Sequence, residues 1–247
     1  MRRLRTAARR ALFLGSRPTI RVSPGQIGLV LLCILTLSVV GEGRWFWRHV
    51  PGYQYHQGCN PAAIPEKDVP NFHKVDDDLY RGAPPACAGY ADLARAGIRT
   101  IIYLQGGSGK ALKSCQKETG VKLDFVSYNL PLVDTVVAGI SDENLAHLFF
   151  TLQQAPKPIF VTCKFGEDRT GVVVALYRMK LGEMPFAEAE QEALYYGMEP
   201  HLLPGITRTL DRFKDPQKLS LIPSPTLSPT PPGGVCKLPA TGEAAGR

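Results

Sequence analysis

The sequence lacks several features that would point to common functional classes. None of its six cysteines forms a C-x-x-C pair, which argues against a zinc site. No internal repeat is visible. Acidic residues are missing from positions 1–41, where seven arginines stand, and this stretch supplies the whole formal charge of +7. The remaining chain holds 22 basic and 22 acidic residues and therefore shows no electrostatic footprint for nucleic acid.

An apolar run follows the basic leader of residues 1–25. Ile27 to Val40 carries no charge, and two tryptophans and a phenylalanine of the kind found at membrane interfaces follow within a few residues. The run is shorter than the roughly 20 residues of a membrane span, but residues 26–47 together come nearer to that length. We predict a membrane anchor that leaves the arginine-rich end in the cytoplasm and exports the rest. A cleaved signal peptide, which would make the protein secreted, and a buried helix of a soluble protein are the alternatives.

Export would permit disulfides among the cysteines. Cys59 and Cys87 are candidates for such a pair, and free, partly buried thiols are the alternative. A further cysteine, Cys115, could resolve an oxidised nucleophile at another position. The full set is Cys33, Cys59, Cys87, Cys115, Cys163 and Cys236.

The pattern of the chain predicts one folded domain between two irregular segments. Residues 48–70 have four prolines and no hydrophobic period, as in a linker, and residues 215–247 are rich in Pro, Ser, Thr and Gly, as in a disordered tail. Between them, residues 71–214 alternate short apolar strands with helices. This alternation predicts an α/β domain with a central, mainly parallel sheet flanked by helices. The predicted strands are 79–81, 99–104, 122–128 and 159–162, and the predicted helices are 90–96, 110–119, 141–154, 170–181, 185–196 and 205–213.

The stretch that carries chemistry is a loop between a strand and a helix. The strand Ile159–Thr162 leads into Cys163, and a helix begins near Thr170. Ligands of open α/β sheets bind beyond the carboxyl ends of strands, and a helix N-terminus favours an anion. In this position Cys163 would be stabilised as a thiolate, and the planar guanidinium of Arg169 could bind two oxygens of a phosphate.

The other residues of the loop fit the same chemistry. Gly166 lets the loop curl so that its N–H groups converge on the phosphate, Thr170 offers a hydroxyl to the sulfur, and Gly171 lets the helix pack closely. The expected contacts with the phosphate or substrate come from Lys164, Phe165, Gly166, Glu167, Asp168 and Arg169. The residues suggest neither a metal nor an organic cofactor.

The spacing Cys163-x5-Arg169-Thr-Gly, with its central glycine, resembles the signature loop of the protein tyrosine and dual-specificity phosphatase superfamily. Upstream, Asn71–Pro85 is similar to the opening strand of the compact atypical dual-specificity phosphatases. The resemblance covers about Asn71 to Phe213 and implies the cysteine phosphatase fold and a phosphocysteine intermediate. Relatives usually have His before the nucleophile, where this chain has Thr162, and this difference bears on how strongly the thiolate is activated.

The general acid of this superfamily is an aspartate on a separate mobile loop. Asp134, just after a predicted strand and about thirty residues before Cys163, matches that position. The alternative is Asp168, where myotubularin-like lipid phosphatases have an aspartate with such a role. Asp142 and Glu143 follow Ser141, a predicted N-cap, and are explained by the start of a helix.

Three functions compete on this sequence. The first is a phosphatase acting on phosphoproteins, including phosphotyrosine and extending to phosphoserine and phosphothreonine. The second is a phosphoinositide or inositol phosphate phosphatase, favoured by Lys164, Asp168 and the membrane segment, whereas Glu167 weakens binding of highly charged substrates. The third is an inactive phosphate-binding module. A rhodanese-like sulfur transferase fits the Arg-Thr-Gly continuation poorly. Arg81 is expected to be structural, with a place in the site as the alternative.

Overall fold

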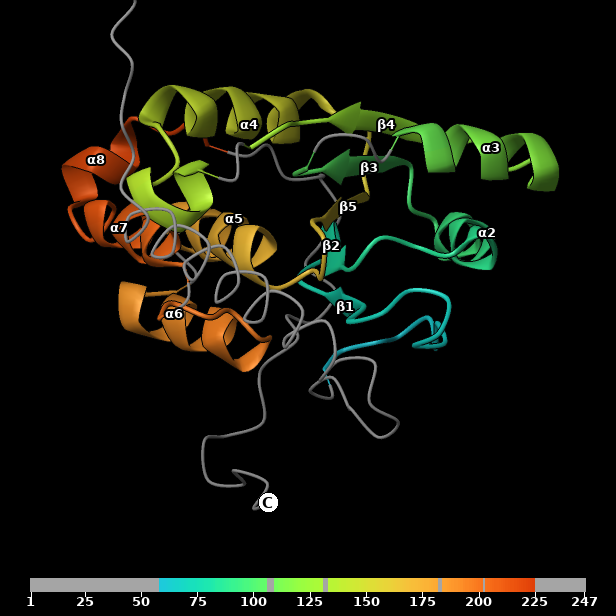
Figure 1. Ribbon diagram of the computed structural model, residues 1–247, viewed down its shortest axis with the longest axis horizontal. Helices are drawn as coiled ribbons and strands as arrows, with labels where there is room; N and C mark the ends of the chain where they lie inside the picture. The colour runs from blue at the N-terminus through green and yellow to red at the C-terminus, as the bar shows by residue number, and fades with distance from the viewer. Residues whose placement is uncertain (1–57, 106–108, 131–132, 182–183, 202, 225–247) are drawn as a thin grey trace, which may run out of the picture. The chain divides into compact units, whose positions relative to one another are not determined.

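The computed structural model describes residues 58–105, 109–130, 133–181, 184–201 and 203–224. In this part of the chain, five strands form one sheet in the order β1-β2-β5-β3-β4 (Figure 1). β1 is antiparallel to β2, and all other neighbours are parallel, so the prediction of a mainly parallel sheet is confirmed. The strands are β1 (His73–Lys74), β2 (Leu79–Gly82), β3 (Thr100–Tyr103), β4 (Asp124–Ser127) and β5 (Ile159–Thr162).

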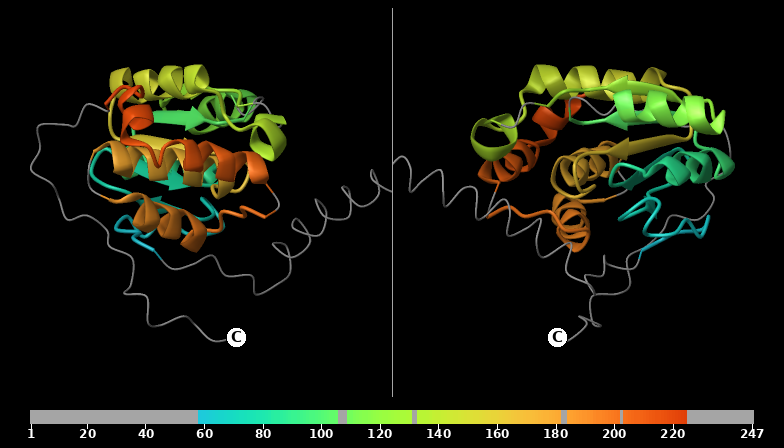
Figure 2. Two further views of the ribbon diagram at one scale, coloured as in Figure 1. Left: turned by 90° about the vertical axis from the view of Figure 1, so that its left-hand side faces the viewer. Right: turned by 45° about the vertical axis from the view of Figure 1, so that its right-hand side comes forward.

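Helices cover both faces of the sheet (Figures 1 and 2). Their bounds agree with the predicted helices to within about three residues, as the uncertainty of helix ends allows. Neither the π-helix η1 nor α8 was predicted. The helices are α2 (Cys87–Arg95), α3 (Gly109–Thr119), η1 (Asp134–Ala138), α4 (Asp142–Gln154), α5 (Asp168–Lys180), α6 (Phe186–Tyr195), α7 (Pro204–Arg212) and α8 (Pro216–Ser220).

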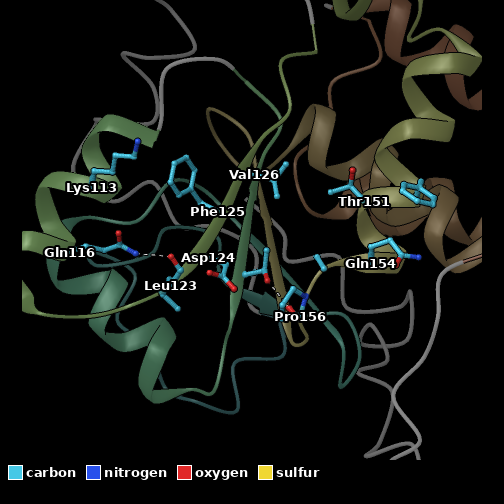
Figure 3. Close-up of a pocket in the computed structure, with 12 residues that line it drawn as sticks. Lys113, Gln116, Leu123, Asp124, Phe125, Val126, Thr151, Gln154 and Pro156 are labelled. Atoms are coloured by element: carbon cyan, nitrogen blue, oxygen red, sulfur yellow. Dashed lines mark hydrogen bonds between the residues drawn. The ribbon is translucent and has the colours of Figure 1, made fainter.

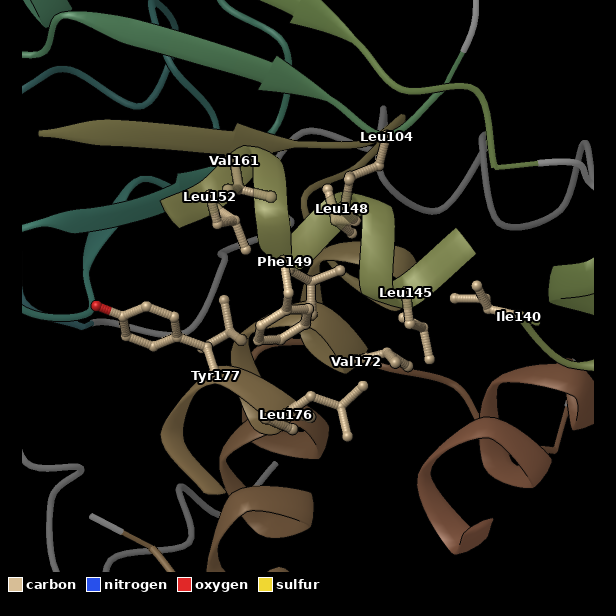
Figure 4. Packing of buried hydrophobic residues seen from close by; sticks show 14 of the residues in the cluster. Leu104, Ile140, Leu145, Leu148, Phe149, Leu152, Val161, Val172, Leu176 and Tyr177 are labelled. Atoms are coloured by element: carbon tan, nitrogen blue, oxygen red, sulfur yellow. The ribbon is translucent and has the colours of Figure 1, made fainter. Parts of the chain in front are cut away.

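The two hydrophobic cores follow from the two-residue period of the strands. On β3, Ile101 and Tyr103 face the core shared with α2 and α3, whereas Ile102 faces the other core. That second core packs α4 and α5 against the sheet, with Phe149 and Val172 at its centre (Figure 4). A central strand is covered on both faces, which explains why all four residues of β5 are buried and the first three are apolar.

The folded domain extends beyond the predicted boundaries at residues 71 and 214. Ile64 and Val69, assigned to the linker, are buried at 5% and 0% exposure. Residues assigned to the tail form α8, and Ile222 packs into the larger core. Isolated apolar residues among prolines and serines were too few to signal this packing, because only the surfaces on which they dock make them part of the core.

The cysteine pairing differs from the prediction. Cys87 at the start of α2 is bonded to Cys115 in α3, with their Cα atoms 5.2 Å apart. Cys59 is also disulfide-bonded, so it cannot be the partner of Cys87. The reason is that α2 and α3 pack together on one face of the sheet. Cys115 is therefore not a free thiol for an oxidised nucleophile, and Cys163 is the free cysteine of the described residues.

The leader 1–25, the apolar segment 26–47 with Cys33, and residues 225–247 with Cys236 lie outside the described residues, and the predictions for them stay predictions. Within the described ranges, no helix combines the length and the apolar character that a membrane crossing needs.

Candidate active site

The central strand β5 delivers Cys163 to the carboxyl edge of the sheet. Its last residue, Thr162, pairs in register with Gly82 of β2 and Tyr103 of β3, so Cys163 is the first residue beyond three aligned parallel strands. The side chain of Cys163 is 3% exposed. Five residues later α5 begins at Asp168, which places the helix N-terminus against the loop, where its free N–H groups favour an anion.

Gly166 gives the loop its shape. Its φ of +70° lies in the left-handed region, and a Cβ there would come within 2.2 Å of the carbonyl carbon of Gly82. The loop is therefore pressed directly on the backbone of β2. Only glycine satisfies both conditions without displacing one of the two segments.

Two buried side chains hold the back of the loop. Arg81 Nη2 donates to the carbonyl oxygen of Gly166 over 2.9 Å, and Asn71 Nδ2 lies 3.4 Å from the carbonyl oxygens of Phe165, Gly166 and Tyr196. In a trans peptide the following N–H points opposite to the carbonyl. The carbonyl groups of Phe165 and Gly166 point toward Asn71 and Arg81. The N–H groups of Gly166 and Glu167 therefore point to the opposite side of the loop, where an anion would bind.

Arg169 joins the loop to the segment that carries the predicted general acid. Its Nε donates to Thr135 Oγ1 over 3.0 Å, and Thr135 is the second residue of η1. Asp134, half-buried, is the first residue of the same π-helix. The structure thus places the residue after Asp134 in contact with Arg169, although the two lie 34 positions apart along the chain.

The remaining loop residues divide into two groups. Lys164 is exposed, with its Nζ 5.1 Å from the ring centroid of half-buried Phe165, so both can be reached from solvent. Glu167 and Asp168 are buried at 0% and 8% exposure. Asp168 Oδ1 accepts a hydrogen bond from the amide of Glu199 over 3.0 Å, which links this acid to the segment after α6.

Two expectations at the edges of the site have clear outcomes. Ser141 is the N-cap of α4 and accepts from the amide of Asn144, as predicted, and Asp142 forms an ion pair with Arg212 at 3.0 Å. Arg81 is structural in that it is fully buried, yet it contacts the loop itself.

A separate groove of about 630 Å³ lies between β4, α3 and α4 (Figure 3). Gln116 and Phe125 line it from one side, and Thr151 and Gln154 line it from the other. No residue of the loop 163–169 contributes to it.

Sequence reasoning missed the contribution of Thr135 and Tyr196. The position of Thr135 directly after the candidate acid was the one available signal. Tyr196 lies with its ring 4.5 Å from the guanidinium of Arg81, a contact between residues that are far apart in sequence.

Comparison with known families covers this region of the chain. A family model described as the tyrosine phosphatase family matches residues 68–200, a range that includes Asn71, Arg81, Asp134 and the whole loop. Among curated proteins, the chain is 28% identical over 117 residues to inositol diphosphatase DSP5 of Arabidopsis thaliana, covering 44% of this chain and 53% of that protein. It is 27% identical over 123 residues to the putative tyrosine-protein phosphatase OCA1 of Kluyveromyces lactis, covering 47% and 59%. The chain thus spans little more than half the length of these relatives.

Solved structures share the fold. The crystal structure of P. aeruginosa TpbA superposes with a TM-score of 0.53 at 22% identity, covering 70% of this chain and 96% of that one. A second structure of TpbA, a variant in complex with pTyr, gives a TM-score of 0.52 at 21% identity, with the same coverage. At this identity the likeness concerns the arrangement of strands and helices.

Proposed function

Since this chain belongs to the tyrosine phosphatase family, whose model spans more than half of it, we propose that it hydrolyses phosphate monoesters of phosphoproteins through a phosphocysteine on Cys163. The observation that carries the proposal is the loop itself. The buried Cys163 follows the central strand. Arg81 and Asn71 bind the carbonyl oxygens of the loop, so that its N–H groups are free to bind an anion. Arg169 lies in the first turn of α5. This arrangement suits a phosphoryl group with three anionic oxygens.

In the first step, the Cys163 thiolate attacks phosphorus in line. The S–P bond forms while the bond from phosphorus to the ester oxygen breaks. Arg169 and the loop amides bind the equatorial oxygens, and Asp134 in its acid form protonates the leaving oxygen. The hydrogen bond from Arg169 to Thr135 supports this role for Asp134, because it keeps the start of η1 beside the phosphate-binding arginine.

In the second step, water attacks the phosphocysteine. The Asp134 carboxylate takes a proton from the water, the P–O bond forms, and the S–P bond breaks to release inorganic phosphate and the thiolate. The hydroxyl of Thr170 is fully buried next to Arg169 and has no hydrogen-bond partner among the described residues. It is therefore available to stabilise the departing sulfur.

The surroundings of η1 favour a substrate with a single phosphate. Of two arginines near η1, Arg212 is paired with the carboxylate of Asp142, and Arg208 donates to the carbonyl oxygen of Val137. Two apolar side chains, Val133 and Val137, are 61% and 54% exposed on the same segment. These exposed valines suit the apolar part of a phosphotyrosine peptide.

An inositol phosphate or phosphoinositide is the second candidate substrate. Relatives of this chain carry the name inositol diphosphatase, and the exposed Lys164 could contact a second phosphate. The buried Glu167 carboxylate does not stand in the solvent-facing part of the loop and so interferes less with a polyanion than its position in the sequence implies.

We also propose that the catalytic domain acts outside the cytoplasm. The Cys87–Cys115 disulfide supports this, because disulfides persist mainly in oxidising compartments. The arginine-rich leader and the apolar segment after it fit the same location. The phosphorylated partners would then be extracellular or periplasmic.

The proposal is tested by phosphate release from three substrates. These are p-nitrophenyl phosphate, a phosphotyrosine peptide and a phosphoinositide, each assayed with the full chain under mild reduction beside Cys163→Ser. We expect turnover to vanish in Cys163→Ser, and the phosphotyrosine peptide to have the highest kcat/KM. A higher kcat/KM for the phosphoinositide would favour the second candidate. A wild-type chain inert on all three, but still able to bind phosphate, would favour the phosphate-binding module.

A further inference from the structure

Arg81 has an unusual environment for an arginine. Its side chain is 0% exposed, and its one hydrogen bond among the described residues runs from Nη2 to the carbonyl oxygen of Gly166. The Nε and Nη1 groups are buried without a hydrogen-bond partner in the described part of the chain. The guanidinium carbon lies 4.5 Å from the ring centroid of Tyr196.

The charge of Arg81 has no carboxylate of its own. Burial and the nearby charge of Arg178 lower the pKa of its guanidinium, while Glu192, Tyr196 and Cys163 act in the opposite direction. Glu192 is already committed to Arg178, with 2.7 Å between Oε2 and Nε. No ion pair joins Arg81 to the buried Glu167 or to any other acid in the ranges that the structure describes.

A buried charge without a partner opposes folding. Such a group is understandable where its charge is balanced by an anion that belongs to the function. Two anions belong to the loop that Arg81 contacts through the carbonyl oxygen of Gly166: the thiolate of Cys163 and a phosphoryl group bound by the loop amides. Arg169 would then act from the first turn of α5 and Arg81 from the β2 side.

We propose that Arg81 is a positioning residue of the phosphate loop whose buried positive charge stabilises the Cys163 thiolate and the bound phosphoryl group through that loop. The inference rests on the proposed function for its role in catalysis. The effect of Arg81 on the ionisation of Cys163 can be measured separately, by a reaction of the thiolate that does not require phosphatase activity.

The experiment compares three substitutions of Arg81 with a matched control. Arg81→Met removes the charge and the hydrogen bond, Arg81→Gln removes the charge and keeps an amide donor, and Arg81→Lys keeps the charge. The control Lys74→Met removes another mostly buried cation of the same sheet, one that is paired with Asp77. The readouts are the rate of Cys163 alkylation by iodoacetamide against pH, mapped by mass spectrometry, inhibition by inorganic phosphate, and thermal unfolding.

We expect the midpoint of the alkylation profile to move up by about one pH unit in Arg81→Gln and Arg81→Met, the size of a typical nearby-charge effect. Inhibition by phosphate should weaken about tenfold in the same variants. Arg81→Lys should keep the midpoint of the alkylation profile at its wild-type value. Its kcat should fall, because lysine does not reproduce the geometry of the hydrogen bond from Arg81 to the loop. The control should lower the unfolding temperature and leave the midpoint unchanged.

An unchanged midpoint in folded Arg81→Gln would overturn the inference and leave Arg81 as a packing residue. If Arg81→Met does not fold, Arg81→Gln and Arg81→Lys still decide the question, because they differ in charge while both can donate a hydrogen bond. A wild-type protein without phosphatase activity would refute the proposed function, whereas the alkylation profiles would still report on Arg81.

Discussion

At the scale of single residues, the two candidate acids near the loop, Asp134 and Asp168, have different surroundings. Asp168 is buried, and its carboxylate accepts a hydrogen bond from the amide of Glu199, so it has a structural explanation. Asp134 is half-buried at the start of η1, next to the residue that contacts Arg169. The geometry therefore favours Asp134 over Asp168 as the proton donor.

Asp134→Asn is expected to lower kcat for a phosphotyrosine peptide about 100-fold, because the leaving oxygen loses its acid. The loss for p-nitrophenyl phosphate should be smaller, since its leaving group needs less protonation. Asp168→Asn is the matched control and should mainly lower the unfolding temperature. Steady-state kinetics of both variants on both substrates decides the assignment, and the reverse order of effects would transfer the acid role to Asp168.

A second prediction at the same scale concerns Gly166. Gly166→Ala should abolish most activity, at least about 100-fold, because the new Cβ would meet the backbone at Gly82 and displace the loop. Gly97→Ala provides the control, since Gly97 has a similar φ of +85° with no atom within 4 Å of the added Cβ. It should cost about 1–2 kcal/mol of unfolding free energy and leave kcat unchanged. Equal activity in the two variants would contradict the close approach of loop and strand.

At the scale of elements, the segment with the candidate acid is held by α7. Thr209 in α7 donates to the carbonyl oxygen of Gly205 and accepts from the amide of Ile140, each over 2.8 Å. Gly205 packs so closely on the backbone at Asp134 that a Cβ would come within 2.3 Å of its oxygen. Helix α7 therefore positions a segment that lies 69 residues earlier in the chain.

Thr209→Val should leave the buried amide of Ile140 unpaired and cost about 1–3 kcal/mol of unfolding free energy. We expect kcat to fall several-fold as η1 loosens, while Thr209→Ser keeps both properties close to wild type. Thermal unfolding and kinetics at a temperature where both variants are fully folded separate the two effects. Loss of stability with an unchanged kcat would show that α7 does not control the acid.

At the scale of the whole molecule, the sheet separates two hydrophobic cores, and only one of them contains Cys163. The core on the α4–α7 side includes Cys163 and leads to the site, whereas the core on the α2–α3 side contains the disulfided Cys115. The disulfide closes a chain segment of 28 residues on the side away from the loop. Its contribution should therefore be to stability rather than to catalysis.

The double variant Cys87→Ser/Cys115→Ser should lose about 3 kcal/mol of unfolding free energy, as expected for a loop of this length, and retain its kcat. Added reductant should lower the unfolding temperature of the wild type more than that of the variant. Denaturant unfolding with and without dithiothreitol measures this difference. A large fall in kcat in the folded variant would show that the two sides of the sheet are coupled.

The sequence by itself determined the fold class and the position of the loop that forms the candidate site. Alternating short apolar strands and helices required a parallel α/β sheet, and the strand before Cys163 with the helix after it required the loop between them. These signals are local, because hydrophobic period, glycine position and residue spacing are properties of a short stretch of chain.

Only the tertiary structure decided which distant residues serve that loop. Asn71 and Arg81 reach its carbonyls, and Thr135 reaches Arg169, through contacts across 34 to 95 positions of sequence. The pairing of Cys87 with Cys115 and the burial of Glu167 depend in the same way on which surfaces pack together. Such contacts leave no periodic mark in the sequence, since each is set by the three-dimensional path of two segments rather than by the residues around either one.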